Sequence, residues 1–133
     1  MSAVLADTHA ALWYLFEPTR LSVAADAALT GAVQSGSFIY ISVITVIEVR
    51  YLVEKYELPA TVWNDLPVAL ADPAVPVESL AVDLDVGRAV ERIARSIVPD
   101  LPDRILAATA LVHNLPLVTA DTKIQSAPIT TIW

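Results

Sequence analysis

Short apolar segments alternate with helix-forming stretches along the whole of this 133-residue chain. The apolar segments have the composition of buried strands and cover residues 3–6, 38–41, 75–79, 117–119 and 129–132. Helices are predicted between them, over residues 9–16, from Ser22 toward Gly36, and over 43–55, 61–71, 83–97 and 104–113. This alternation is typical of a parallel sheet covered on both faces. We therefore expect an α/β fold with a five-stranded parallel sheet flanked by helices, in one domain over residues 1–133.

Two of these elements carry further expectations. Pro76 lies within the third strand and has no amide to donate, so that strand should be short or at an edge of the sheet. The helix over residues 83–97 places Arg88, Arg92 and Arg95 on one stripe. This stripe is either a track for phosphates or a solvated face with a Glu91–Arg95 ion pair, and the solvated face is favoured.

Acidic residues stand where the ends of several elements should meet. Asp7 and Asp121 each follow a predicted strand within an Ala-Asp-Thr sequence. Strand ends of this kind gather at the ligand-binding rim of a parallel sheet. Asp103 follows Pro102 and is expected at or next to the N-cap of the helix over 104–113, with Asp100 three residues earlier. Each of these residues could also be an ordinary cap or turn residue.

Glu48 has an unusually apolar setting. Its helix neighbours Ile44 and Leu52 are apolar, so its carboxylate needs a partner. That partner is either Arg50 or Arg104 in an ion pair, or a bound cation. Clustered carboxylates suit Mg²⁺ or Mn²⁺, and the sequence has no cysteine and no histidine cluster for zinc. A site of this kind can activate water for phosphodiester cleavage.

Composition limits the classes of partner. A net charge of −7 argues against nucleic-acid binding through a broadly basic surface. Apolar residues make up 56% of the chain and charged residues only 17%, which favours self-association or a tight protein partner. The sequence shows no membrane-spanning run and no signal peptide, and it lacks cysteine. A cytoplasmic protein without membrane contacts is therefore expected.

Four sequence motifs resemble those of the PIN-domain ribonucleases, particularly the VapC-type toxins of type II toxin–antitoxin pairs. They are LADTHAALW at residues 5–13, IEV at 47–49, DRILAATA at 103–110 and LVTAD at 117–121. The resemblance implies a PIN-like fold, Mg²⁺- or Mn²⁺-dependent cleavage of RNA, a homodimer, and inhibition by a cognate antitoxin in a heterotetramer or larger complex.

The resemblance also implies roles for individual residues. The four acids of the family correspond to Asp7, Glu48, Asp103 and Asp121. Asp7 and Asp103 are the first candidates for direct metal ligands. Glu48 would orient a second metal or the attacking water, and Asp121 would complete the shell. The supporting positions are Asp100, which matches a further acid of some members, and Thr119, where a hydroxyl often supports the site.

Two other functions are compatible with the size and fold class of this chain. A receiver-like phospho-acceptor domain has a similar size and fold class, but Asp7 stands alone and Ser79 occupies the acceptor position. A catalytically inactive PIN-fold binding module is disfavoured because all four acids are present.

His9 could touch substrate, and Trp13, Tyr14 and Phe16 could stack on bases. For His9 a packed or surface position is preferred, and for the other three residues ordinary packing in the core or a dimer interface.

Overall fold

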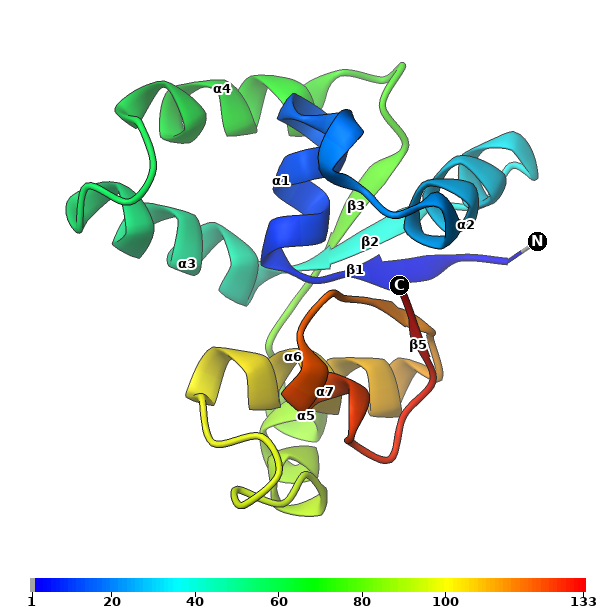
Figure 1. Cartoon of the computed structure of the whole chain (residues 1–133), viewed down its shortest axis with the longest axis vertical. Helices are drawn as coiled ribbons and strands as arrows, with labels where there is room; N and C mark the ends of the chain where they lie inside the picture. The colour runs from blue at the N-terminus through cyan, green and yellow to red at the C-terminus, as the bar shows by residue number, and fades with distance from the viewer. Residues whose placement is uncertain (1) are drawn as a thin grey trace.

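The computed structural model describes residues 2–133 and contains a five-stranded sheet with helices on both faces (Figure 1). The strands lie in the order β3-β2-β1-β4-β5, and every neighbouring pair is parallel. They are β1 (Val4–Ala6), β2 (Ile39–Ser42), β3 (Val77–Leu80), β4 (Leu117–Val118) and β5 (Thr131–Ile132). The predicted parallel sheet is confirmed, and β3 is an edge strand, as Pro76 predicted.

Seven helices and two short 3₁₀ turns are present in the part of the chain that the structure describes. They are α1 (Thr8–Phe16), η1 (Pro18–Arg20), α2 (Val23–Gln34), α3 (Val43–Glu54), α4 (Ala60–Ala71), α5 (Leu84–Ala89), η2 (Val90–Arg92), α6 (Leu101–His113) and α7 (Thr122–Gln125). The four-residue helix α7 had not been predicted. Within residues 2–133, no helix combines the length and apolar character needed to cross a membrane.

Alternate residues of the central strand pack on opposite faces of the sheet. Val4 and Ala6 belong to the core beneath α1 and α2, whereas Leu5 belongs to the core beneath α5 and α6 (Figure 1). This period of two is the signature of a strand that is covered on both sides. A third, smaller cluster of Leu12, Val49 and Leu66 joins α1, α3 and α4.

The helix predicted over residues 83–97 is interrupted. It ends at Ala89 in α5 and continues only as the turn η2. The cause is Arg104 of α6, whose guanidinium donates hydrogen bonds of 2.8–3.1 Å to the carbonyl oxygens of Val90 and Ile93. A side chain distant in sequence therefore satisfies acceptors that a continuing helix would have used.

The interruption removes the predicted stripe of Arg88, Arg92 and Arg95. Arg95 lies beyond η2, so the three residues no longer share one helical face. The predicted ion pair between Glu91 and Arg95 is not formed among the described residues. All three arginines are exposed, in agreement with the preferred solvated face.

Helix α6 begins three residues earlier than predicted. Its N-cap is Asp100, whose Oδ2 accepts from the Asp103 amide at 3.4 Å. Pro102 therefore lies inside the first turn, where its missing amide costs nothing. Asp103 is a first-turn residue of the helix and is not its cap.

Candidate active site

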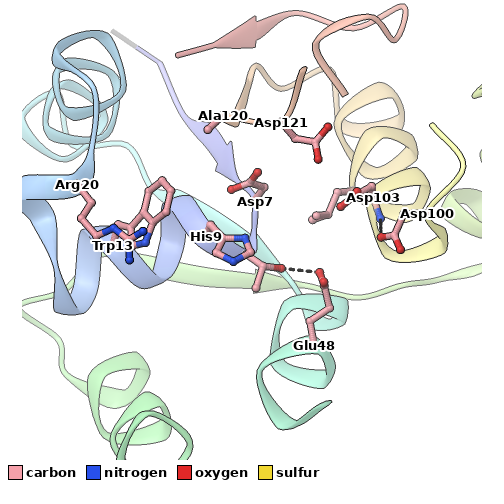
Figure 2. Close-up of a pocket in the computed structure, with 11 residues that line it drawn as sticks. Asp7, His9, Trp13, Arg20, Glu48, Asp100, Asp103, Ala120 and Asp121 are labelled. Atoms are coloured by element: carbon pink, nitrogen blue, oxygen red, sulfur yellow. Dashed lines mark hydrogen bonds between the residues drawn. The ribbon is translucent and has the colours of Figure 1, made fainter. Parts of the chain in front are cut away.

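An acidic cleft of about 480 Å³ lies at the carboxyl edge of the sheet (Figure 2). It gathers residues from the junction between β1 and α1, from α1, η1, α3 and α6, and from the segment after β4. The lining residues are Asp7, Thr8, His9, Trp13, Arg20, Glu48, Asp100, Asp103, Leu106, Ala120 and Asp121. The cleft therefore brings together the four predicted acids and Asp100.

Asp7 joins β1 to α1. Its amide donates to the carbonyl oxygen of Val118 at 3.1 Å, and its Oδ1 caps α1 by accepting from the Ala10 amide at 2.8 Å. The residue is only 7% exposed. Burial raises the pKa of Asp7 above its usual value, although hydrogen bonds from Thr119 and Ala10 act in the opposite direction.

Asp121 takes the equivalent position after β4. Its Oδ1 caps α7 by accepting from the amides of Lys123 and Ile124 at 2.8 and 3.1 Å. The buried Thr119 hydroxyl accepts from the Asp121 amide at 3.0 Å, so it lies next to the acid that it was predicted to support. The Ala-Asp-Thr sequences at the two strand ends thus build two similar strand-to-helix junctions.

Glu48 reaches the cleft from α3, and no arginine neutralises it. Arg50 pairs with Glu54, and the Arg104 side chain is engaged with backbone carbonyls, so both predicted ion-pair partners are wrong. Its Oε1 instead accepts a 2.6 Å hydrogen bond from the Thr8 hydroxyl. Burial raises the pKa of Glu48, and the negative charges of Asp100 and Asp7 add to the effect.

Asp103 has a strongly raised pKa in the folded protein. Burial, followed by the charges of Asp100, Asp121, Glu48 and Asp7, raises its pKa from 3.8 to about 7. Figure 2 shows Asp7, Asp103 and Asp121 around a common space, with Glu48 reaching toward it from α3. Within residues 2–133, none of these four acids forms an ion pair with a basic side chain.

These residues fit a hard divalent cation. Asp7 and Asp121 are held as helix caps and Glu48 by the Thr8 hydroxyl, while burial, with repulsion from neighbouring acids, raises the pKa values of Asp7, Glu48 and Asp103. Within residues 2–133, no three acidic or histidine side chains are grouped closely enough to form a ligand set by themselves. Mg²⁺ commonly uses one or two carboxylates and completes its shell with water and substrate phosphate. An open carboxylate cleft has that character.

Four further residues line the cleft that local sequence patterns do not assign to it: Thr8, His9, Trp13 and Arg20. Thr8 had no predicted role, although its position after Asp7 repeats that of Thr122 after Asp121. No sequence pattern placed Arg20 in the cleft, because it lies on the short turn η1 after α1. Trp13 packs against His9 and Trp133, in agreement with a packing role, and both Trp13 and His9 also line the cleft. Tyr14 and Phe16 pack against core clusters, in agreement with the expected packing role.

A sequence model of the PIN domain family matches residues 4–129 of this chain. The chain is also 30% identical to "Ribonuclease VapC22" of Mycobacterium tuberculosis (strain ATCC 25618 / H37Rv) over 141 aligned positions, which include the full length of both proteins.

Solved structures show the same fold. The toxin–antitoxin assembly VapBC2 from Rickettsia felis, bound to a DNA fragment from its promoter, contains a chain that matches with a TM-score of 0.72 at 16% identity, over 97% of this chain and 96% of that one. A toxin–antitoxin complex from Klebsiella pneumoniae matches with a TM-score of 0.65 at 22% identity, over 98% and 96% of the two chains.

Proposed function

This chain belongs to the PIN-domain family, among its VapC-type members, and from that premise we propose that it is a toxin that cleaves RNA with the help of Mg²⁺ or Mn²⁺. The observation that carries the proposal is the cleft itself. Asp7, Glu48, Asp103 and Asp121 converge there from separate elements, and no basic side chain pairs with them among the described residues.

The chain's own residues would divide the work as follows. Asp7 and Asp103 would hold the metal directly, and Asp121 would support it, partly through water. When bound, the metal would supply a more acidic water and stabilise the leaving oxygen. The Oε1 of Glu48 is fixed by Thr8, which leaves Oε2 to orient the attacking water or a second ion. Asp100 would add negative charge at the edge of the cleft.

The proposed protein partner is an antitoxin. The similar chains from Rickettsia felis and Klebsiella pneumoniae occur in toxin–antitoxin complexes. A basic side chain of such a partner would find strong attraction in a cleft whose acids repel one another, and it would compete there with metal. Excess Mn²⁺ should therefore partly relieve the inhibition.

A homodimer is also proposed, for which exposed apolar side chains give support. Ile47, Tyr51 and Leu101 are 48%, 64% and 61% exposed, and they border a groove of about 380 Å³. The same groove includes Glu48 and Asp100. Covering it with a second copy would remove apolar surface from water beside the active site.

The activity is tested with purified protein and total RNA, with Mg²⁺ or with chelator. The wild type should cut RNA only with metal, and Asp103→Asn should lose activity by at least about 100-fold. Asp65→Asn is the matched control, since it removes an exposed carboxylate outside the cleft. Cleavage that persists in Asp103→Asn would contradict the assigned site. A wild type that cuts no RNA would favour the inactive binding module.

A further inference from the structure

The wall of the cleft opposite the acids is aromatic and basic. Trp13 lies there with Arg20, whose guanidinium carbon is 4.6 Å from the centroid of the Trp13 ring (Figure 2). Trp13 is itself supported by His9 and Trp133, with ring centroids 5.7 and 5.6 Å away. Of the side chains that line the cleft within residues 2–133, Arg20 alone carries a permanent positive charge.

Arg20 does not neutralise the acids of the cleft. Its ion pair is with Glu17, at 3.4 Å between Nη1 and Oε2, and that pair is well exposed. Arg20 forms no ion pair with Asp7, Glu48 or Asp103. An exposed pair of this kind adds little to folding stability. The cation is therefore held at the edge of the cleft and remains accessible to a ligand.

A second arginine of the chain has almost the same surroundings. Arg50 lies 5.4 Å from the centroid of the Trp63 ring and pairs with Glu54 at 2.9 Å. Unlike Arg20, it does not line the acidic cleft. The stacking of arginine on tryptophan is therefore not in itself a sign of a ligand site, and the distinguishing feature of Arg20 is its position.

We propose that Arg20, positioned by Trp13, binds an RNA phosphate next to the one that is cleaved. The inference rests on the proposed ribonuclease function. A metal would neutralise the charge at the reacting phosphate, but the flanking phosphates of the strand must still approach an acidic cleft. A guanidinium binds phosphate through charged hydrogen bonds, and a tryptophan face restricts its orientations. Arg20 would thereby fix the register of the strand in the cleft.

The test uses a short RNA with one defined cut and a neutral methylphosphonate linkage placed in turn at each flanking position. The nucleotide that bears the methylphosphonate also carries a 2′-O-methyl group. The reference RNA has the same 2′-O-methyl nucleotide with an ordinary phosphate. Cleavage is measured with Mg²⁺ for the wild type, Arg20→Ala, Trp13→Leu and the matched controls Arg50→Ala and Trp63→Leu. Thermal melting checks that each variant is folded.

For the wild type, one neutral flanking linkage should lower kcat/KM by about tenfold, the effect of losing one charged hydrogen bond. On unmodified RNA, Arg20→Ala should have a kcat/KM about tenfold lower than the wild type, mainly because KM rises. The neutral linkage should cause no further loss in this variant. Trp13→Leu should show a smaller loss, while Arg50→Ala and Trp63→Leu should keep the wild-type profile. Arg20→Lys should recover part of the activity.

The possible failures differ from one another. If the wild type cuts RNA and Arg20→Ala keeps its full sensitivity to the same linkage, this inference is overturned and the ribonuclease function stands. If Arg20→Ala weakens antitoxin binding alone, the residue belongs to the protein interface and the inference is again overturned. If the wild type cuts no RNA, the proposed function and the inference fail together.

Discussion

The Thr8 hydroxyl donates a 2.6 Å hydrogen bond to Oε1 of Glu48 and lies 3.1 Å from the Thr45 hydroxyl. These contacts connect α1 to α3 across the cleft, over 37–40 residues of sequence. Thr8 is buried, so the bond is protected from competition with water. It holds one oxygen of Glu48 and leaves the other free for the proposed reaction.

Replacing Thr8 by valine should therefore impair cleavage without unfolding the protein. The substitution keeps the shape of the side chain but leaves Glu48 without its donor. Loss of a residue that positions a ligand commonly costs 10–100-fold, and we expect that range in kcat with metal saturating. Thr8→Ser restores the hydroxyl and should recover most of the activity. Equal losses in the serine and valine variants would show that the hydroxyl has no such role.

The stability of the metal-free protein should fall as pH rises from about 4 to 7. The pKa of Asp103 is about 7 in the folded protein and near 3.8 when it is exposed. Between these values the folded state holds a proton that the unfolded state has released, so increasing pH favours unfolding. Thermal melts with chelator should show the decrease, and Asp103→Asn should reduce it and raise Tm at pH 8. A wild-type Tm that climbs through this window would contradict the prediction.

Metal should stabilise the wild type more than a variant that lacks one ligand. At a metal concentration of about 100 times Kd, binding to the folded state contributes about 2.7 kcal/mol. Asp7→Asn should lose most of the rise in Tm with Mg²⁺ or Mn²⁺. Asparagine is chosen because Asp7 also caps α1 through the Ala10 amide, and its side-chain oxygen keeps that bond. The same rise in both proteins would place the metal elsewhere.

The protein alone should run as a dimer in light scattering at micromolar concentration. A charge at Tyr51 would oppose burial of the apolar groove, so Tyr51→Asp should shift the population to monomer. Val68 has a similar exposure, 71% against 64%, but lies outside that groove, which makes Val68→Asp a suitable control. Dissociation by the control alone would move the interface to another surface.

Arg104 should contribute to the stability of the fold through its hydrogen bonds to backbone carbonyls, rather than by neutralising an acid. Its three hydrogen bonds to Val90 and Ile93 end α5 and hold η2 against α6. Arg104→Met removes the donor to the Ile93 carbonyl and one of two donors to the Val90 carbonyl, which keeps the Ile93 amide, and it should destabilise the protein by about 2–3 kcal/mol in urea unfolding. Arg92→Met, on an exposed part of η2, should change stability by no more than about 0.5 kcal/mol.

Local patterns predicted most of the fold, and distant contacts explain the errors. The strands were recognised because each is a short apolar run bounded by polar residues. Residues 83–97 have a true helical period, yet Arg104 ends the helix from 11–14 residues away. Asp7 and Asp121 were predicted at the rim because they follow strands, Glu48 because its helix neighbours are apolar, and Asp103 because it begins a helix. The Thr8–Glu48 bond and the place of Arg20 depend on how α1 packs, for which the sequence carries no short-range signal.

The helix caps at Asp7 and Asp121 give the proposed toxin a characteristic spectrum of escape mutations. Cells that carry an active toxin select alleles that have lost it, and asparagine is one base change from aspartate. At Asp7 and Asp121, asparagine keeps the cap, whereas most other residues also weaken the fold. Glu48 caps no helix, so many substitutions there should leave a folded, harmless protein. Harmless alleles that still produce folded protein should therefore be dominated by asparagine at Asp7 and Asp121 and varied at Glu48.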